Sequence, residues 1–232
     1  MRAYTKTILC LANSRKLSGR CIAGKEKLEE GGYGDWIRPV SARASEDISE
    51  EERRYEDGRS PEVLDVIYVP MLEPKANRHQ SENHLIDDKY YWEKVGSANW
   101  ADVEGALDTV SGPLWINRHS TWNGLNDQVP EAEVDSLTSS LYLIRPTNLR
   151  ISVGVEGGVY GPVKRKVRAS FSLNQSSYTL MVTDPVIERT YLAGQNGSFP
   201  IKKAILCVSL GEVFYEYAYK LVATVITPDL GD

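Results

Sequence analysis

Apolar and polar residues alternate most regularly in the second half of the chain. Within Val163–Leu173, apolar residues at 167, 169, 171 and 173 alternate with cationic or hydroxyl residues. A period of two is typical of a β-strand with one buried face. Asn174-Gln175-Ser176 can turn, and the alternation resumes from Tyr178. This stretch therefore predicts a β-hairpin.

Shorter apolar runs, rich in β-branched residues, predict the other strands. We expect them over residues 5–12, 20–24, 36–40, 63–72, 114–116, 141–145, 204–210 and 214–226. Residues 13–16, Asn-Ser-Arg-Lys, are expected to form the turn between the first two of these strands.

Helix signals are fewer and lie mostly before residue 140. Ser49 and Glu52 have the spacing of a capping box, which predicts an exposed acidic helix to about residue 57. Ser97 or Asn99 can cap a second helix over residues 100–110. We read the turns after residues 182 and 210 as polar strand ends. The fold class expected is mostly β with minor α.

Two domains are expected. All five tryptophans lie between Trp36 and Trp122, and the polar stretch 133–140 follows them. We place the boundary there, which gives an N-terminal domain with helical and loop insertions over 1–138 and a C-terminal domain over 139–232. The second domain has the size of a small β-barrel or sandwich.

The tripeptide Ile-Arg-Pro occurs once in each domain, at 37–39 and at 144–146. It is either the trace of a duplication or a coincidence, since a match of three residues arises easily by chance.

Composition places the chain among ordinary soluble proteins, with 41% hydrophobic and 25% charged residues. The N-terminus has no signal-peptide pattern, and no apolar run is long enough to span a bilayer. The three cysteines form no CxxC pair, so we expect neither a disulfide framework nor a zinc ribbon. A reducing, cytoplasmic location is expected.

Charge is distributed unevenly along the chain. The net charge of −5 divides into +5 over residues 1–43, −13 over 44–140 and +3 over 141–232. The folded protein could therefore present a basic face although it is acidic overall. The alternative is that acidic surface helices in the middle simply keep the protein soluble.

Three groups of cations and aromatic residues could bind nucleic acid. Polar donors in the expected loop at 13–20 could hold a phosphate, or they could belong to an ordinary turn. An arginine next to an aromatic residue at a strand end suits single-stranded nucleic acid, although a core aromatic residue with a paired surface arginine has the same sequence. Cations at every second position of one strand can track phosphates or protect a sheet edge. The candidate residues are Asn13, Lys16, Arg20, Tyr33, Trp36, Arg38, Arg145, Lys164, Lys166 and Arg168.

The segment 77–88 is rich in polar residues, including two histidines and three carboxylates. A metal site there is conceivable but matches no known spacing. We expect instead a polar loop that hydrogen-bonds across the domains through Gln80, Glu82, Asn83 and His84. Asp184 and Glu212 could be paired carboxylates or turn formers, and Cys21 is expected to be structural. We expect no metal, no cofactor and no catalytic residue.

Several segments, taken in order, carry a resemblance that covers nearly the whole chain. They are LANSRKLSGRCIAG (11–24), WIRPVS (36–41), QSENHLID (80–87), LWINRHSTWNGLND (114–127), SLYLIRP (140–146), YTLMVTDP (178–185), VSLGE (208–212) and YAYKLVA (217–223). The chain resembles the dual OB-containing domain family of bacterial proteins. The resemblance implies two OB-like barrels, which often bind oligonucleotides, and a setting in prokaryotic conflict or defence. It implies no catalytic set.

These observations lead to a non-catalytic protein that binds single-stranded DNA or RNA. One alternative is a protein-interaction adaptor or small-ligand sensor, because a fold does not fix a function. A further alternative is a metal-dependent enzyme that processes nucleic acid, with ligands drawn from the 77–88 segment.

Overall fold

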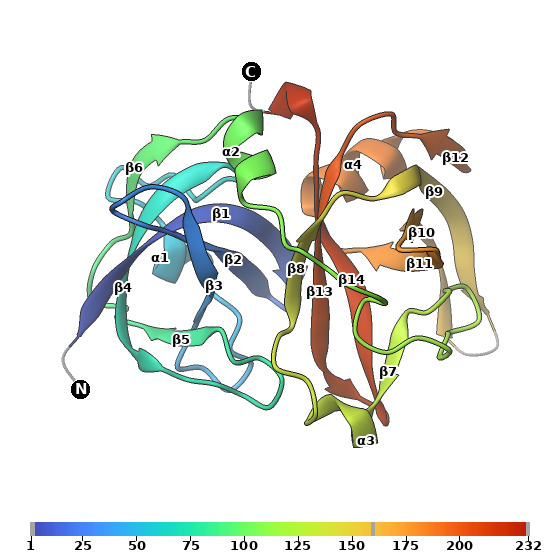
Figure 1. Cartoon of the computed structure of the whole chain (residues 1–232), viewed down its shortest axis with the longest axis horizontal. Helices are drawn as coiled ribbons and strands as arrows, with labels where there is room; N and C mark the ends of the chain where they lie inside the picture. Colours follow the sequence, from blue (N-terminus) through green and yellow to red (C-terminus); the bar gives the residue numbers. More distant parts are fainter. Residues whose placement is uncertain (1–2, 159–160, 231–232) are drawn as a thin grey trace. The chain divides into compact units, whose positions relative to one another are not determined.

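The computed structural model describes residues 3–158 and 161–230. The chain is mostly β, as predicted, and forms two compact units, each with its own sheet (Figure 1). Unit 1 comprises Met1–Leu107, Thr138–Ser140 and Pro228–Asp232, and unit 2 comprises Asp108–Leu137 and Leu141–Thr227.

The division differs from the single boundary expected after residue 138. Residues 108–137 belong to unit 2 because their apolar side chains, such as Leu114 and Val129, are buried in its core. Residues 138–140 belong to unit 1, where the carbonyl of Thr138 accepts a hydrogen bond from Ser81 at 2.8 Å. Such long-range hydrogen bonds and burial are not visible in local sequence patterns.

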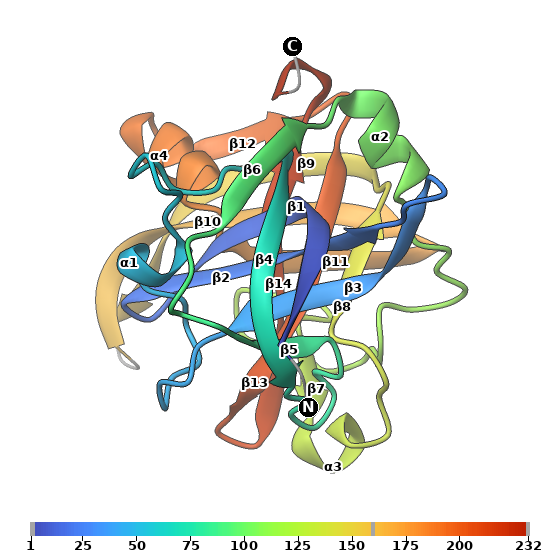
Figure 2. The same ribbon diagram turned by 90° about the vertical axis from the view of Figure 1, so that its left-hand side faces the viewer.

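Unit 1 is a closed barrel. Its strands are β1 (Tyr4–Lys16), β2 (Gly19–Lys27), β3 (Tyr33–Val40), β4 (Asp65–Pro74), β5 (Asn83–Ile86) and β6 (Glu93–Ser97). The order is β1-β2-β3-β5-β4, with an antiparallel β1–β4 pairing that closes the sheet and a parallel β3–β5 pairing. In Figure 2, which faces this unit, β2 runs across the view and β4 runs from top to bottom. This is the strand order of an OB-like barrel.

Alternate residues of these strands fill the barrel. Ile8, Cys10, Ile22, Ile67 and Val69 are all fully buried in one core cluster. This core cluster takes every second residue of β1 and β4, as expected where one face of a strand points into a barrel.

The helices of unit 1 are shorter than predicted. The capping box of Ser49 and Glu52 is confirmed, but α1 covers only Glu50–Arg53. The chain then becomes extended and buries Tyr55, whose hydroxyl donates to Asp65 at 2.7 Å. Burying this tyrosine in the core ends the helix early.

The second predicted helix, α2, covers Trp100–Gly105. Asn99, rather than Ser97, is its N-cap, and the Asn99 side chain accepts from the backbone of Ala101 and Asp102. None of the helices in the described part of the chain is long and apolar enough to cross a membrane.

Unit 2 is a second OB-like barrel. Its main strands are β8 (Leu141–Ile144), β9 (Thr147–Gly158), β10 (Gly161–Leu173), β11 (Ser176–Val182), β13 (Ile205–Phe214) and β14 (Tyr217–Ile226). The order is β9-β10-β11-β14-β13-β8, and β11 and β14 are parallel, as β3 and β5 are in unit 1. The smaller elements are β7 (Gln128–Pro130), α3 (Glu131–Val134), α4 (Pro185–Ala193), β12 (Gly197–Pro200) and, in unit 1, the 3-10 helix Pro228–Leu230.

The predicted hairpin is confirmed as β10 and β11. Phe171 lies opposite Tyr178 in register, and their rings stack with centroids 5.3 Å apart. The turn residues Asn174 and Gln175 both have positive φ, which is the backbone of a type I′ turn.

Four predicted elements are wrong. The turn expected after residue 210 is not formed there, because β13 continues to Phe214 and the turn lies at Tyr215 and Glu216. Residues 13–16 continue strand β1 instead of turning, and the turn lies at Leu17 and Ser18. Residues 114–116 form a loop. Its apolar residues Leu114 and Trp115 are buried in the core of unit 2 without forming a strand. Helix α4 follows β11 where we expected a turn: Asp184 is its N-cap and Pro185 occupies its first turn.

The two Ile-Arg-Pro segments do not occupy equivalent positions. The first lies within β3, the third strand of its barrel, and the second spans the break between β8 and β9. The tripeptide is therefore not the trace of a duplicated barrel.

Candidate functional site

Arg38 is at the centre of a buried hydrogen-bonded cluster in unit 1. Its side chain is only 4% exposed. The guanidinium lies 3.1 Å from the Glu82 carboxylate and donates to Ser140 at 2.8 Å and to Asn83 at 3.3 Å. Asn83 in turn donates to Gln80 at 3.3 Å, and Ser140 donates to Glu82. These contacts link β3 and the start of β5 to the 138–140 segment.

We predicted that Arg38 contacts phosphates. Because its guanidinium is buried against the Glu82 carboxylate, it is not accessible to a ligand in solution. Gln80, Glu82 and Asn83 form a polar network, but its contacts lie within unit 1, whereas we expected hydrogen bonds across the domains. Among the described residues, no three His, Cys, Asp or Glu side chains gather as metal ligands would.

His84, the last residue predicted for the polar loop, lies in strand β5. Its Nδ1 is 2.5 Å from the Tyr4 hydroxyl. Burial, together with the nearby Lys6 ammonium, lowers the pKa of His84. The imidazole is therefore neutral at neutral pH and can act as a hydrogen-bond donor and acceptor.

The two aromatic candidates of unit 1 are half-buried. The Lys25 ammonium lies 5.8 Å from the centroid of the Trp36 ring, a cation–π contact. The Tyr33 hydroxyl donates to Asp102 at 3.2 Å, and burial together with that carboxylate raises the pKa of Tyr33 to about 12. Tyr33 is thus tied to α2, whereas Trp36 also faces a cavity.

The predicted loop at 13–20 is a β-ribbon. Asn13 lies opposite Ile22 in the β1–β2 pairing, and its side chain donates to the Pro61 carbonyl at 2.7 Å. Arg20 exchanges backbone hydrogen bonds with Ile48. Asn13 therefore has a structural partner, while Lys16 and Arg20 lie near the tip of the ribbon.

The cationic stripe on β10 is present but partly neutralised. Glu156 of β9 lies opposite Lys164, is 3.8 Å from the Lys166 ammonium and receives two hydrogen bonds from Arg168, at 2.6 and 3.0 Å. Burial would raise the pKa of Glu156, but Arg168 and Lys166 hold it below its usual value. Arg168 is only 8% exposed and also lies 3.7 Å from Asp127.

Arg168 is therefore a buried clamp between two carboxylates and not a phosphate contact. Lys164 is exposed and Lys166 is half-buried, so these two lysines remain as the accessible part of the stripe.

Arg145 is exposed between β8 and β9, but the aromatic partner expected for it is not available. Tyr142 packs against Trp115, with ring centroids 5.1 Å apart. Tyr142 therefore fits the alternative interpretation, in which the aromatic residue near the arginine packs in the core and does not stack on a base.

Among the residues of unit 2 that the structure describes, the most exposed aromatic one is not among those predicted from the sequence. Trp122 is 99% exposed on the loop between residues 114 and 128. The loop is pinned beneath it: the Asp127 carboxylate accepts from the backbone and hydroxyl of Thr121 at 2.7 and 2.6 Å. Asn126 receives a hydrogen bond from the Arg118 backbone at 2.8 Å and donates to the Ser177 carbonyl at 2.9 Å. A tryptophan within this Asn- and Asp-rich loop was the signal that could have identified it.

The loop lies between the stripe on β10 and the tip of another hairpin. On one side, the Asn123 side chain hydrogen-bonds to Glu156. On the other, the His119 ring lies 6.2 Å from the Tyr217 ring, next to the β13–β14 turn. That turn carries two more exposed aromatic residues, Phe214 (64%) and Tyr215 (81%).

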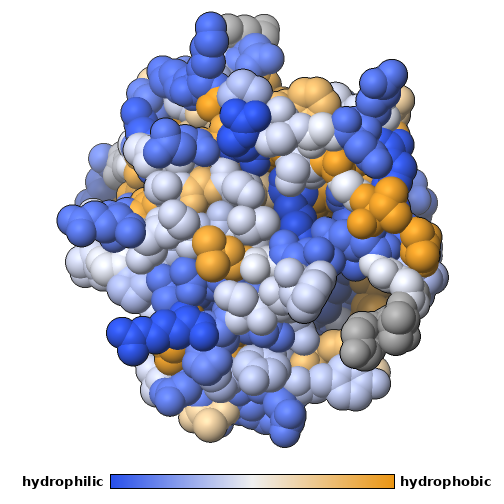
Figure 3. All heavy atoms as spheres, turned by 90° about the vertical axis from the view of Figure 1, so that its right-hand side faces the viewer, coloured by the Kyte–Doolittle hydropathy of each residue, from blue (hydrophilic) through white to orange (hydrophobic). Residues whose placement is uncertain are grey.

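We refer to Trp122, Phe214, Tyr215, Lys164 and Lys166 as the aromatic–basic surface of unit 2. The face of the molecule in Figure 3 is mostly hydrophilic, with its apolar side chains in separate groups. It shows no broad apolar patch of the kind that marks a protein–protein interface.

The base of the Trp122 loop is anchored by a buried lysine. Lys220 is 1% exposed, and its ammonium donates to the Ile116 carbonyl at 2.6 Å and to Asn117 at 3.0 Å. It also lies 5.4 Å from the centroid of the Tyr178 ring, whose hydroxyl accepts from the Leu114 backbone at 2.9 Å. Burial lowers the pKa of Lys220 to about 7.

The model of a known family, described as the dual OB-containing domain, matches residues 6–225, nearly the whole chain. No curated protein and no solved structure matches the chain. The two barrels described above agree with this description, which names a fold and no ligand.

Proposed function

Because this chain belongs to the dual OB-containing domain family, we propose that it binds single-stranded nucleic acid, without catalysis, on the aromatic–basic surface of unit 2. The observation that carries the proposal is Trp122, whose side chain is 99% exposed on a loop held by hydrogen bonds. OB-like barrels offer such surfaces to oligonucleotides.

A fixed, exposed indole suits stacking against a base. Because the loop is already ordered by Thr121, Asn126 and Asp127, little conformational entropy is lost when a base stacks on Trp122. Stacking of this kind contributes about 1–3 kcal/mol for each base and does not depend on which base is present. Phe214 and Tyr215 would extend the platform at the hairpin tip.

Lys164 and Lys166 supply the charge that the phosphates require. Two phosphate contacts on a single strand predict a slope of about −1.4 when the logarithm of the association constant is plotted against that of salt concentration. Binding of this kind is modest in affinity, in keeping with a protein whose net charge is −5.

The test is fluorescence anisotropy of labelled single-stranded DNA, single-stranded RNA and duplex at several salt concentrations. We expect single strands to bind and Trp122→Ala to weaken binding by about 5- to 150-fold, the equivalent of one lost stack. Tyr90→Ala is the matched control, because Tyr90 is 63% exposed but lies in unit 1.

A second pair of variants tests the charge. Lys164→Ala with Lys166→Ala should flatten the salt dependence, whereas Lys89→Ala, at an exposed site of unit 1, should leave it unchanged. Absence of binding to every single strand, or equal binding by wild type and Trp122→Ala, would refute the proposal.

A further inference from the structure

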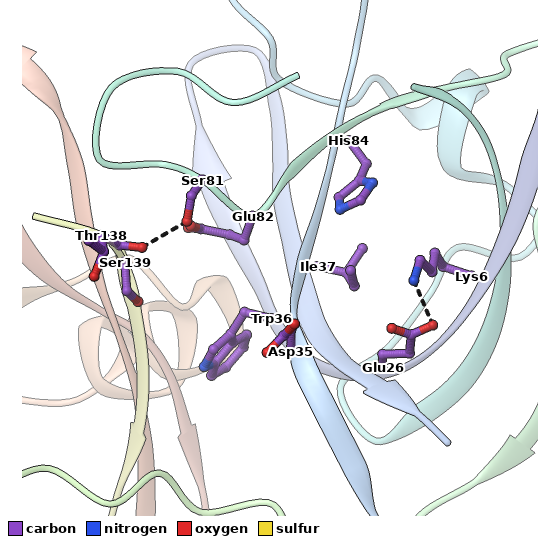
Figure 4. A pocket seen from close by; sticks show the side chains of 10 residues that line it. All are labelled: Lys6, Glu26, Asp35, Trp36, Ile37, Ser81, Glu82, His84, Thr138 and Ser139. Atoms are coloured by element: carbon purple, nitrogen blue, oxygen red, sulfur yellow. Dashed lines mark hydrogen bonds and ion pairs between the residues drawn. The ribbon is translucent and has the colours of Figure 1, made fainter. Parts of the chain in front are cut away.

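Unit 1 contains a cavity of about 430 Å³. Figure 4 shows its lining, which includes Lys6 from β1, Glu26 from β2, Asp35 and Trp36 from β3, and His84 from β5. The cavity falls in the size range of sites for small molecules, about 300–1,000 Å³.

Carboxylates outnumber cations in this lining. The lining holds the carboxylates of Glu26, Asp35 and Glu82 and the ammonium of Lys6. Because Arg38 neutralises Glu82 at 3.1 Å, an excess of one negative charge remains. Lys6 is also paired with Glu26 at 2.7 Å. An excess of carboxylates repels phosphates and carboxylates, and it favours ligands that donate hydrogen bonds.

Acceptors remain available to such a ligand. Lys6 contacts Oε1 of Glu26, so Oε2 can accept another hydrogen bond. Asp35 is an exposed residue of β3. The lowered pKa of His84 keeps its imidazole neutral, which adds a group that both donates and accepts.

Trp36 supplies a flat apolar surface beside Asp35. In Figure 4 its indole lies next to Asp35, with Ser81 and Ser139 on the same side of β3. An aromatic ring with carboxylates and hydroxyls around it matches a ring-shaped ligand whose faces are apolar and whose rim carries hydroxyl groups.

We propose that this cavity binds a small, uncharged ligand with a polyhydroxylated ring, which stacks on Trp36 and donates hydroxyl hydrogens to Asp35 and Glu26. The ring could belong to a free sugar or be the ribose of a nucleoside, since both present the same hydroxyl chemistry. The site lies within unit 1 and does not depend on the nucleic-acid surface of unit 2.

The experiment is saturation-transfer NMR and calorimetry on the full chain with adenosine, uridine, ribose, glucose and adenosine monophosphate. We expect at least one uncharged member to bind, and the monophosphate to bind at least tenfold more weakly than adenosine. Binding of nucleosides alone would identify the ribose of a nucleoside as the ligand ring, and binding of the monosaccharides would identify a sugar.

Two variants of the cavity test the contacts. Asp35→Asn changes an exposed side chain, so the fold is not at risk, and it should weaken binding at least tenfold. Trp36→Ala should do the same, with its folding checked by circular dichroism. Trp122→Ala in unit 2 and Asp88→Asn at another exposed site should bind as the wild type does.

The proposal is overturned if no uncharged member binds at millimolar concentration, if the monophosphate binds as well as adenosine, or if Asp35→Asn and Trp36→Ala have no effect. These outcomes leave the nucleic-acid proposal untouched, because Trp122→Ala tests that surface separately.

Discussion

The buried Lys220 should make the stability of the protein depend on pH in a particular direction. Burial lowers its pKa from 10.5 to about 7 in the folded state. Below pH 7 the amine is protonated in both states, and the folded state bears the full cost of a buried charge. Above pH 10.5 the amine is neutral in both states and that cost disappears. The free energy of unfolding must therefore rise between pH 7 and 10.5.

The size of the effect follows from the two pKa values. The difference between 10.5 and 7, at about 1.4 kcal/mol for each pH unit, gives about 5 kcal/mol in total. Between pH 7.5 and 9 the rise should be about 2 kcal/mol. A neutral amine still has two N–H groups, so it can keep its hydrogen bonds to Ile116 and Asn117 across this range.

The assay is urea denaturation at half-unit steps from pH 7 to 9.5, with wild type, Lys220→Met and Lys202→Met. Lys220→Met should lack the rise, so the difference from wild type should change by about 2 kcal/mol between pH 7.5 and 9. Lys202 is exposed in the same unit, and its replacement should leave the pH dependence intact. Parallel curves for wild type and Lys220→Met would show that the lysine stays protonated, and the reasoning from burial would fail.

Two further variants test contacts that hold each barrel together. Arg38→Met should lower the free energy of unfolding by about 3–5 kcal/mol in urea denaturation, because the Glu82 carboxylate is left buried without its partner. Adding Glu82→Gln should recover part of that loss; a double variant as unstable as the single one would contradict the electrostatic cause. Asp184→Ala should cost about 1 kcal/mol for the lost cap of α4, and about 1–3 kcal/mol more because the buried backbone N–H of Val225 loses its acceptor. A change in melting temperature no larger than that of an exposed Asp57→Ala variant would argue against this role.

The strands were predictable where the pattern was local. The β10–β11 hairpin follows from alternation alone, because one face of each strand is buried and the turn is short. Helix α4 was missed because Asp184-Pro185 suits a polar turn as well as a helix start. The apolar residues 114–116 predict a strand because a short apolar strand and an apolar loop packed on a core have the same local pattern.

The candidate site was harder to predict, because exposure depends on contacts distant in sequence. Arg38 has the sequence context of a ligand-binding arginine, yet its partner Ser140 lies 102 residues away. The alternation along β10 places Arg168 on the face opposite the core, as predicted, yet the carboxylates of Glu156 and Asp127 contact its guanidinium and leave it buried. For Trp122 the sequence context suggests no binding role, yet its side chain is exposed. The hydrogen bonds that hold its loop in this position could not be predicted from the local sequence.

The division of the chain between the units has a consequence for synthesis on the ribosome. Residues 108–137 emerge before the strands that bury Leu114, Val129 and Val134 have been made. Those side chains are not fully buried until β14, the last strand, has left the exit tunnel. For the same reason, a fragment that begins after residue 138 would lack part of the core of the second barrel, whereas a fragment of residues 108–227 would contain all of unit 2.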